Sequence, residues 1–174
     1  MDKFFIRPVT TNDLAMLQQI SRQTFTETFA EVNTAENMAK YLEEELSLER
    51  LSAELSTPSS EFYFAVLNDQ VIGYLKLNTG HAQTELKDSR AVEIERIYVS
   101  KAFHGKNIGQ LLYEKAIRSA REKKAEYVWL GVWEENTKAI GFYKKNGFVE
   151  FDKHIFRLGE DEQTDIMMRK KVEY

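Results

Sequence analysis

The stretch from Glu93 to Arg118 constrains the fold more than any other part of this chain, because it combines a strand, a turn and a helix. The apolar and β-branched residues of Ala91–Val99 predict a strand. HGKNIG, His104 to Gly109, then predicts a turn, and the residues that follow place their apolar side chains on one helical face, formed by Ile108, Leu111, Leu112, Ala116, Ile117 and Ala120. Such a helix should pack on a sheet, so we expect an α/β protein.

The turn has the properties of an anion site. Gly105 and Gly109 allow the backbone to approach a ligand closely, and the helix that starts here directs unpaired N–H groups and its positive dipole end outward. A bound phosphate would gain charge-assisted hydrogen bonds, Lys106 would add a positive charge, and the dipole would contribute about 0.3–1 kcal/mol. Glycines also occur in turns for geometric reasons alone, so this spacing leaves both interpretations open.

With its flanking strand and helix, this turn resembles the cofactor motif of the GNAT superfamily of acetyl-CoA-dependent N-acetyltransferases. The family signature is Gln/Arg-x-x-Gly-x-Gly/Ala at the start of the helix, and Gly109 matches its last position. Asn107 replaces the first glycine, which is a mild departure because Asn tolerates left-handed dihedral angles. His104 replaces the usual Gln or Arg and is the larger departure.

A second motif strengthens this resemblance. WLGVWEENTKAIGFYKKNGF, Trp129 to Phe148, is similar to the family's strand followed by Asn-x-x-Ala-x-x-Phe-Tyr-x-x-x-Gly-Phe. With the opening IRPVTTNDL, Ile6 to Leu14, the resemblance covers nearly the whole chain and is closest to bacterial polyamine (spermidine/spermine) acetyltransferases of the Pai type. It implies a single domain over residues 1–174, with a mixed central β-sheet flanked by helices on both faces.

The remaining pattern agrees with an α/β fold. We expect seven strands, at Phe4–Val9, Glu61–Leu67, Val71–Leu77, Ala91–Val99, Tyr127–Trp133, Phe148–Phe156 and Asp165–Lys171. A first helix should end at about Arg22, Thr24–Leu55 has a helical and acidic pattern, and Asn136 or Thr137 should cap a helix over Lys138–Lys145. Gly73 could mark a bulge, and Asn78–Arg90 is expected to be a loop, of a length that is often functional.

Composition excludes several classes of function. The 174 residues contain no cysteine, which excludes disulfides and thiolate chemistry and fits a cytoplasmic location. A net charge of −4 argues against nucleic-acid binding, and no apolar run approaches the roughly 20 residues that a membrane span needs. The three histidines, His81, His104 and His154, are too scattered to indicate a metal site. Assembly into a homodimer stays open.

Catalysis on an amine requires proton transfers. An alkyl ammonium has a pKa of about 10.4, so the nucleophile must lose a proton before it can attack a thioester. Glu93 and Glu95 could accept it, directly or through water, and would share one face of their strand unless a bulge intervenes. The resemblance places Glu93 at the position of a family general base and Tyr143 at that of the acid that protonates the leaving thiolate. Solvated or paired glutamates and a tyrosine packed in the core are the structural alternatives.

The resemblance also implies a set of acetyl-CoA contacts and direct transfer in a ternary complex. Backbone groups of Ile97, Tyr98 and Val99 would hold the pantetheine amides. The turn and first helical residues would hold the pyrophosphate: His104, Gly105, Lys106, Asn107, Ile108, Gly109 and Gln110. Asn136, Lys138, Tyr143 and Lys145 complete the set, although a lysine in the last helical turn also suits the helix dipole.

The acceptor is expected to be a small amine, with a polyamine such as spermidine or spermine implied by the Pai-type resemblance. Carboxylates that could form an acidic trough for it are Glu27, Glu31, Glu36, Glu43, Glu44, Glu45, Asp88, Glu93 and Glu95. A solvated helix face is the plainer interpretation of Glu43–Glu45. Two other functions stay open, namely acetylation of protein or peptide amines and non-catalytic acyl-CoA binding, and Tyr143 with the paired glutamates favours an enzyme.

Overall fold

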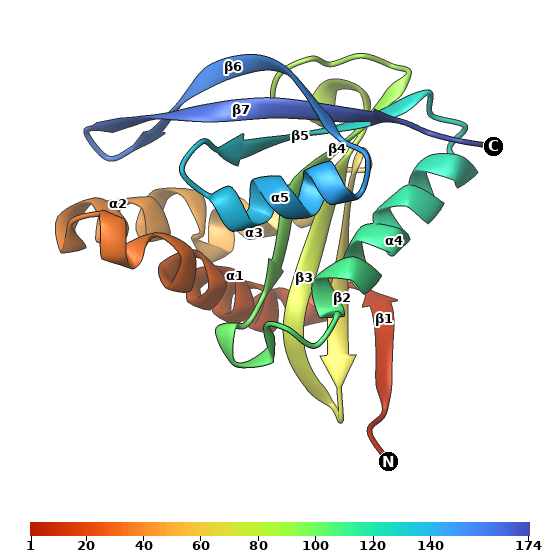
Figure 1. The fold of residues 1–174 in the computed structure, drawn as a ribbon. Helices are drawn as coiled ribbons and strands as arrows, with labels where there is room; N and C mark the ends of the chain where they lie inside the picture. The colour runs from red at the N-terminus through yellow and green to blue at the C-terminus, as the bar shows by residue number, and fades with distance from the viewer.

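The computed structural model describes all residues from 1 to 174, and its seven strands form one sheet in the order β1-β2-β3-β4-β5-β7-β6 (Figure 1). The strands are β1 (Phe4–Pro8), β2 (Ser60–Leu67), β3 (Gln70–Asn78), β4 (Ala91–Val99), β5 (Tyr127–Trp133), β6 (Val149–Leu158) and β7 (Asp161–Lys171). The helices are α1 (Leu14–Phe29), α2 (Ala35–Glu45), α3 (Leu48–Leu55), α4 (Ile108–Glu122) and α5 (Thr137–Lys145).

The sheet is mixed, as expected. Strands β1 to β4 pair antiparallel, β4 and β5 pair parallel with α4 as the crossover between them, and β5, β7 and β6 are again antiparallel. Parallel pairing requires such a crossover because both strands start at the same end of the sheet, so the chain must return to that end before the second strand begins. The parallel pair therefore lies at the centre of an otherwise antiparallel sheet.

Helices cover both faces of the sheet, which confirms the predicted architecture (Figure 1). Helices α4 and α5 lie over a core of 22 buried residues that includes Leu112 and Ala116 of α4. Helices α1, α2 and α3 lie over a second core of 12 buried residues on the other face, to which Leu17, Phe25 and Leu51 belong. The alternation of side chains along β2 to β5 supplies both cores at once.

The largest departures from the predicted limits are at the end of α1 and at the turn between β6 and β7. Helix α1 continues to Phe29 instead of ending at about Arg22, because the hydroxyls of Thr24 and Thr28 donate to the carbonyls four residues earlier and are satisfied inside the helix. The turn between the last two strands is shorter than predicted. Leu158 already pairs with Asp161, because Gly159 adopts φ +63° and closes a tight turn.

Several local predictions are confirmed. Asn107 lies in the left-handed region with φ +68°, directly before α4. Asn136 caps α5, its side chain accepting a hydrogen bond from the Ala139 N–H. A register shift between Ala65 and Val66 places a bulge beside Gly73.

None of the helices is long and apolar enough to cross a membrane.

Candidate active site

A large cavity lies where β4 and β5 separate. The two strands pair only from Ala91 to Glu93 on β4 and from Tyr127 to Trp129 on β5, and beyond this point they diverge (Figure 1). The cavity between them has a volume of about 770 Å³ and reaches from α1 and α2 to the starts of α4 and α5. The backbone of β4 beyond Glu93 therefore has no strand partner on the side that faces β5.

A β-bulge at Glu95 determines which side chains of β4 face this cavity. Lys76 of β3 pairs with Arg96 and Leu77 pairs with Ile94, so Glu95 is the extra residue. A bulge places two successive side chains on one face of a strand. Glu95 and Arg96 consequently both lie on the face covered by α1 to α3, where Glu93 also lies, and all three line the cavity. The bulge therefore does not separate the two glutamates.

Glu93 is held in the cavity wall by three hydrogen bonds. Its Oε1 accepts from the Asn78 side-chain amide at 3.0 Å and from the Thr84 N–H at 2.8 Å, and its Oε2 accepts from the Thr84 hydroxyl at 2.5 Å. Glu93 is only 3% exposed, and burial raises the pKa of its carboxyl above the usual value in spite of these donors. A raised pKa makes Glu93 a better proton acceptor than an ordinary surface glutamate.

Glu95 is instead part of an ion-pair cluster. Its carboxylate lies 2.8 Å from the Lys76 Nζ and 3.1 Å from an Arg96 guanidinium nitrogen, and Glu54 pairs with the same two cations at 2.7 and 3.1 Å. Burial opposes ionisation of Glu95, but the charges of Arg96 and Lys76 outweigh it and lower its pKa to about 2. The Asn78 amide also donates to Glu95. Glu95 is therefore a fixed anion rather than a proton acceptor near neutral pH.

The predicted anion site lies at the other end of the cavity. Gly105 has φ +79°, and a Cβ built on Gly109 would meet no atom within 4 Å, so the space in front of the first turn of α4 is open. Of the seven residues expected to hold a pyrophosphate, six line the cavity, namely His104, Gly105, Asn107, Ile108, Gly109 and Gln110. Lys106 does not, and its ammonium lies instead over the Phe103 ring.

Two side chains of this turn are engaged within the protein. The His104 Nε2 lies 2.7 Å from the carbonyl oxygen of Val99, one of the β4 groups expected to contact pantetheine. The Gln110 side-chain amide exchanges two hydrogen bonds with that of Asn146, at 3.0 and 3.2 Å, and so ties the start of α4 to the end of α5. What this turn offers a ligand is therefore mainly its backbone N–H groups.

Tyr143 lies between the two ends. It is 7% exposed, its ring packs against Phe142 and Phe148, and its hydroxyl has no hydrogen-bond partner in the protein although the residue lines the cavity. Desolvation raises the pKa of Tyr143 well above its usual range, so the hydroxyl keeps its proton. Tyr143 therefore has features of both sequence-based alternatives. Its ring is packed as in a core residue, and its hydroxyl is free as a general acid requires.

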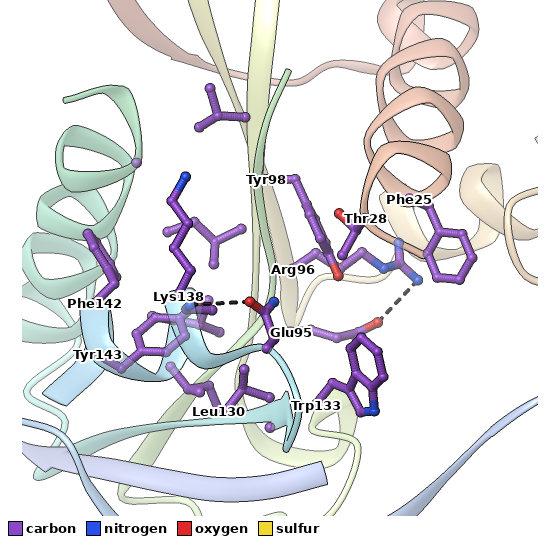
Figure 2. Close-up of a pocket in the computed structure, with 18 of the residues that line it drawn as sticks. Phe25, Thr28, Glu95, Arg96, Tyr98, Leu130, Trp133, Lys138, Phe142 and Tyr143 are labelled. Carbon is purple, nitrogen blue, oxygen red and sulfur yellow. Dashed lines mark hydrogen bonds and ion pairs between the residues drawn. The ribbon is translucent and has the colours of Figure 1, made fainter. Parts of the chain in front are cut away.

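The walls of the cavity differ in character. Figure 2 shows one wall formed by Lys138, Phe142 and Tyr143, an opposite wall formed by Phe25, Thr28 and Tyr98, and a dashed line that joins Glu95 to Arg96. The other predicted contacts Ile97, Val99, Asn136 and Lys145 also line the cavity. Lysines and the positive end of α4 therefore lie at one end, and carboxylates lie at the other.

The predicted acidic trough does not assemble around the cavity. Of its nine carboxylates only Glu93 and Glu95 line it. Glu27, Glu31, Glu36, Glu43 and Glu44 are exposed on the helical arm, Glu45 pairs with Arg50, and Asp88 is paired with Arg90 and Tyr127. The third carboxylate of the cavity is Asp165 of β7, which the sequence did not mark because only its register opposite Trp133 brings it there. Thr84 and Asn78, which hold Glu93, were likewise missed, although both belong to Asn78–Arg90, the predicted loop whose length is often that of a functional or disordered segment.

The three histidines remain dispersed. His104 and His154 line different parts of the cavity, and His81 is exposed. The structure contains no group of three or more His, Cys, Asp or Glu side chains placed to hold a metal ion.

Comparison with known proteins agrees with this geometry. The sequence pattern of the Acetyltransferase (GNAT) family matches residues 15–148. A protein of Lactobacillus delbrueckii subsp. lactis, described as an uncharacterized N-acetyltransferase in the pepI 3' region, is 43% identical over 164 residues, covering 94% of this chain and 95% of that protein. The spermidine N(1)-acetyltransferase of Thermoplasma acidophilum is 25% identical over 172 residues, with 97% of each chain covered.

A solved structure has the same fold. The crystal structure of the PaiA N-acetyltransferase from Thermoplasma acidophilum in complex with coenzyme A superposes with a TM-score of 0.80 at 25% identity, covering 97% of this chain and 99% of that one. The Pai-type resemblance of the sequence is thus supported by both comparisons. With the family pattern spanning most of the chain and the separated β4–β5 pair at its centre, the chain belongs to the GNAT family and is an N-acetyltransferase.

Proposed function

We propose that this protein transfers an acetyl group from acetyl-CoA to the primary amine of a polyamine, by direct transfer in a ternary complex. The observation that carries the proposal is the polarity of one continuous cavity. Its α4 end offers free backbone N–H groups and lysines to phosphates, and its other end offers carboxylates to a cationic amine. Both reactants fit one site, and alignment of bound reactants can lower a barrier by up to about 7–11 kcal/mol.

The α4 end suits coenzyme A by its shape and its charge. The first turn of α4, after Asn107, directs N–H groups into open space in front of Gly109. Lys138 and Lys145 line the same region and would pair with phosphate oxygens. The unpaired edge of Ile97–Val99 can hydrogen-bond the pantetheine amides as an added strand would. Coenzyme A bound here would present its thioester as the acetyl donor.

The proton transfers are assigned to Glu93 and Tyr143. Glu93 takes the proton of the acceptor ammonium, directly or through one water, and the freed amine nitrogen forms a bond to the acetyl carbon. The carbon–sulfur bond then breaks, and the Tyr143 hydroxyl gives its proton to the departing thiolate. The acetylated nitrogen loses its second proton, through water, and that proton restores the Tyr143 hydroxyl. Burial raises the pKa of Glu93, which makes its carboxylate a stronger proton acceptor, and the raised pKa of Tyr143 keeps that hydroxyl protonated. The pKa of Glu95 is too low for the first role.

The acceptor assignment is tested by an acetyl-CoA turnover screen against polyamines, amino acids, antibiotic amines and peptides. If spermidine or spermine is the acceptor, its Michaelis constant should rise with added salt, because screening at about 0.15 M ionic strength limits electrostatic reach to roughly 8 Å. An amine of similar length with a neutral tail serves as the control and should respond much less. Efficient acetylation of a peptide together with no turnover of spermidine at low salt would exclude the polyamine assignment.

The proposed position of coenzyme A predicts the effect of a substitution at Gly109. The Gly109→Val variant should fold normally, because no atom lies within 4 Å of the new Cβ, yet its side chain would occupy the space assigned to the pyrophosphate. We expect coenzyme A affinity, measured by calorimetry, to fall at least about tenfold, which corresponds to 1.4 kcal/mol. Gly141→Val is the matched control, since Gly141 lies on α5 outside the cavity with the same open surroundings. Equal affinities in both variants would contradict the placement.

A further inference from the structure

Asp165 differs from the other carboxylates of the cavity in having no hydrogen-bond donor. Glu93 accepts three hydrogen bonds and Glu95 contacts two cations, whereas no donor of the protein reaches Asp165. Its side chain is nevertheless only 15% exposed. Burial raises the pKa of Asp165 to about 6, and His154 opposes this shift. Asp165 lines the cavity with no protein donor on its carboxylate, so a cationic ligand in the cavity can supply the hydrogen bonds that this carboxylate can accept.

The surroundings of Asp165 leave room for such a ligand. The nearest ionisable group is His154 of β6, whose Nε2 lies 3.7 Å from the Asp165 carboxylate, beyond hydrogen-bond distance. The other ring nitrogen, Nδ1, is buried without a hydrogen-bond partner and lies 3.9 Å from the Glu85 carboxylate. No lysine or arginine lies within 4.0 Å of Asp165. Two side chains with unmet hydrogen-bonding capacity therefore meet at one wall of the cavity.

Gly131 of β5 opens the space in front of this wall. A Cβ at this position would lie 3.3 Å from a ring carbon of His154 and 3.6 Å from a carboxylate oxygen of Asp165. Asp165 pairs with Trp133, which lies four residues along β5 from Trp129, the partner of Glu93. At about 3.3 Å per residue, Asp165 lies roughly 13 Å along the strand from the level of Glu93, and its carboxylate leans back towards Gly131. Both carboxylates line the same cavity.

We infer that Asp165, with His154 beside it, binds a second ammonium group of the acceptor while the first reacts next to Glu93. This inference rests on the proposed function and narrows it to acceptors that carry two amino groups a short alkyl chain apart. Trp133 and Phe156 line the cavity near this wall and provide apolar surface for the connecting chain. An ammonium supplies the donors that Asp165 lacks, and an alkyl chain of this kind requires no other polar contact.

The test compares a diaminoalkane with the n-alkylamine of the same chain length, over a series of lengths, in wild-type enzyme and in Asp165→Asn. The change keeps the shape of the side chain and removes its charge. For the diamine we expect kcat/KM to fall roughly 10–100-fold, mainly through KM, as for a lost hydrogen bond to a charged group. The monoamine should be acetylated equally well by both proteins. Glu162→Gln, on the same strand but at the surface, is the control and should change neither substrate.

Two outcomes would overturn the inference. If Asp165→Asn leaves the ratio of diamine to monoamine turnover unchanged, Asp165 does not bind the second amine. If it lowers kcat for both amines alike, Asp165 and His154 act on the reaction itself. Calorimetry of the diamine with each protein in the presence of coenzyme A separates this inference from the proposed function. Binding that is weakened by Asp165→Asn, with no acetylation of any amine by the wild type, would reject the proposed function and retain the subsite.

Discussion

Replacement of Tyr143 by Phe is expected to lower kcat about 10²–10⁴-fold, the usual effect of losing a positioned general acid. The change removes one hydroxyl that makes no hydrogen bond in the protein and keeps the ring between Phe142 and Phe148. Thermal stability should therefore stay close to that of the wild type. Steady-state kinetics and a melting curve of the same preparation measure the two quantities.

Tyr113→Phe is the matched control for this change. Tyr113 is also buried and packs against the same two phenylalanines, but it lies outside the cavity, and its hydroxyl contacts the Lys170 ammonium at 3.2 Å. It should retain normal turnover. If Tyr143→Phe also retains it, Tyr143 is a core residue, and the proton for the thiolate comes from solvent.

Replacement of Glu93 by Gln should lower kcat/KM about 10²–10⁴-fold at neutral pH, because the acceptor amine then keeps its proton. Glutamine matches the shape of Glu93, and its amide oxygen can still accept from Asn78 and Thr84. The deficit should shrink as the pH approaches the amine pKa of about 10.4, since a growing fraction of the acceptor arrives already deprotonated. A pH–rate profile of both proteins with one acceptor tests this.

The pKa of Glu93 also sets the acid side of that profile. Its value is raised by burial, so wild-type activity should be lost as the pH falls through a value above the 4.5 of an ordinary glutamate. Glu95→Gln is the informative comparison. Breaking its buried ion pairs should lower stability, by about 3–5 kcal/mol for a pair left with one charge, but the acid limb should persist because Glu93 is still present. Loss of the acid limb in Glu95→Gln instead would assign the base to Glu95.

Much of the fold could be predicted because its signals are local. The limits of β4 and β5 were predicted correctly, since β5 is a continuous apolar run and β4 is rich in β-branched residues. Asn107 was predicted to tolerate a left-handed conformation, and it adopts one. The end of α1 was predicted too early, because threonine lowers helix propensity in sequence while its hydroxyl can be satisfied inside a helix that packing already holds.

The chemistry of the site depended on contacts between distant parts of the chain. The separate environments of Glu93 and Glu95 follow from Asn78, Thr84 and Lys76, which reach them only through the pairing of β3 with β4 and the loop between these strands. Arg96 follows Glu95 in the chain and shares its face because of the bulge. Side-chain alternation indicated one shared face but could not distinguish a desolvated carboxylate from an ion-paired one. Asp165 was missed for the same reason, since its place depends on the register of β7 against β5.

The separation of β4 from β5 creates a sheet edge in the interior of the molecule. An exposed edge of this kind usually invites pairing with other chains, and proteins protect it with charges, prolines or bulges. Here the rest of the fold shields it, and main-chain groups are available along Ile97–Val99 whatever side chains these residues carry. Ile97 and Val99 can therefore pack against one core and Tyr98 against the other. Substitutions that preserve packing at these three positions can accumulate without altering what the edge presents to a ligand.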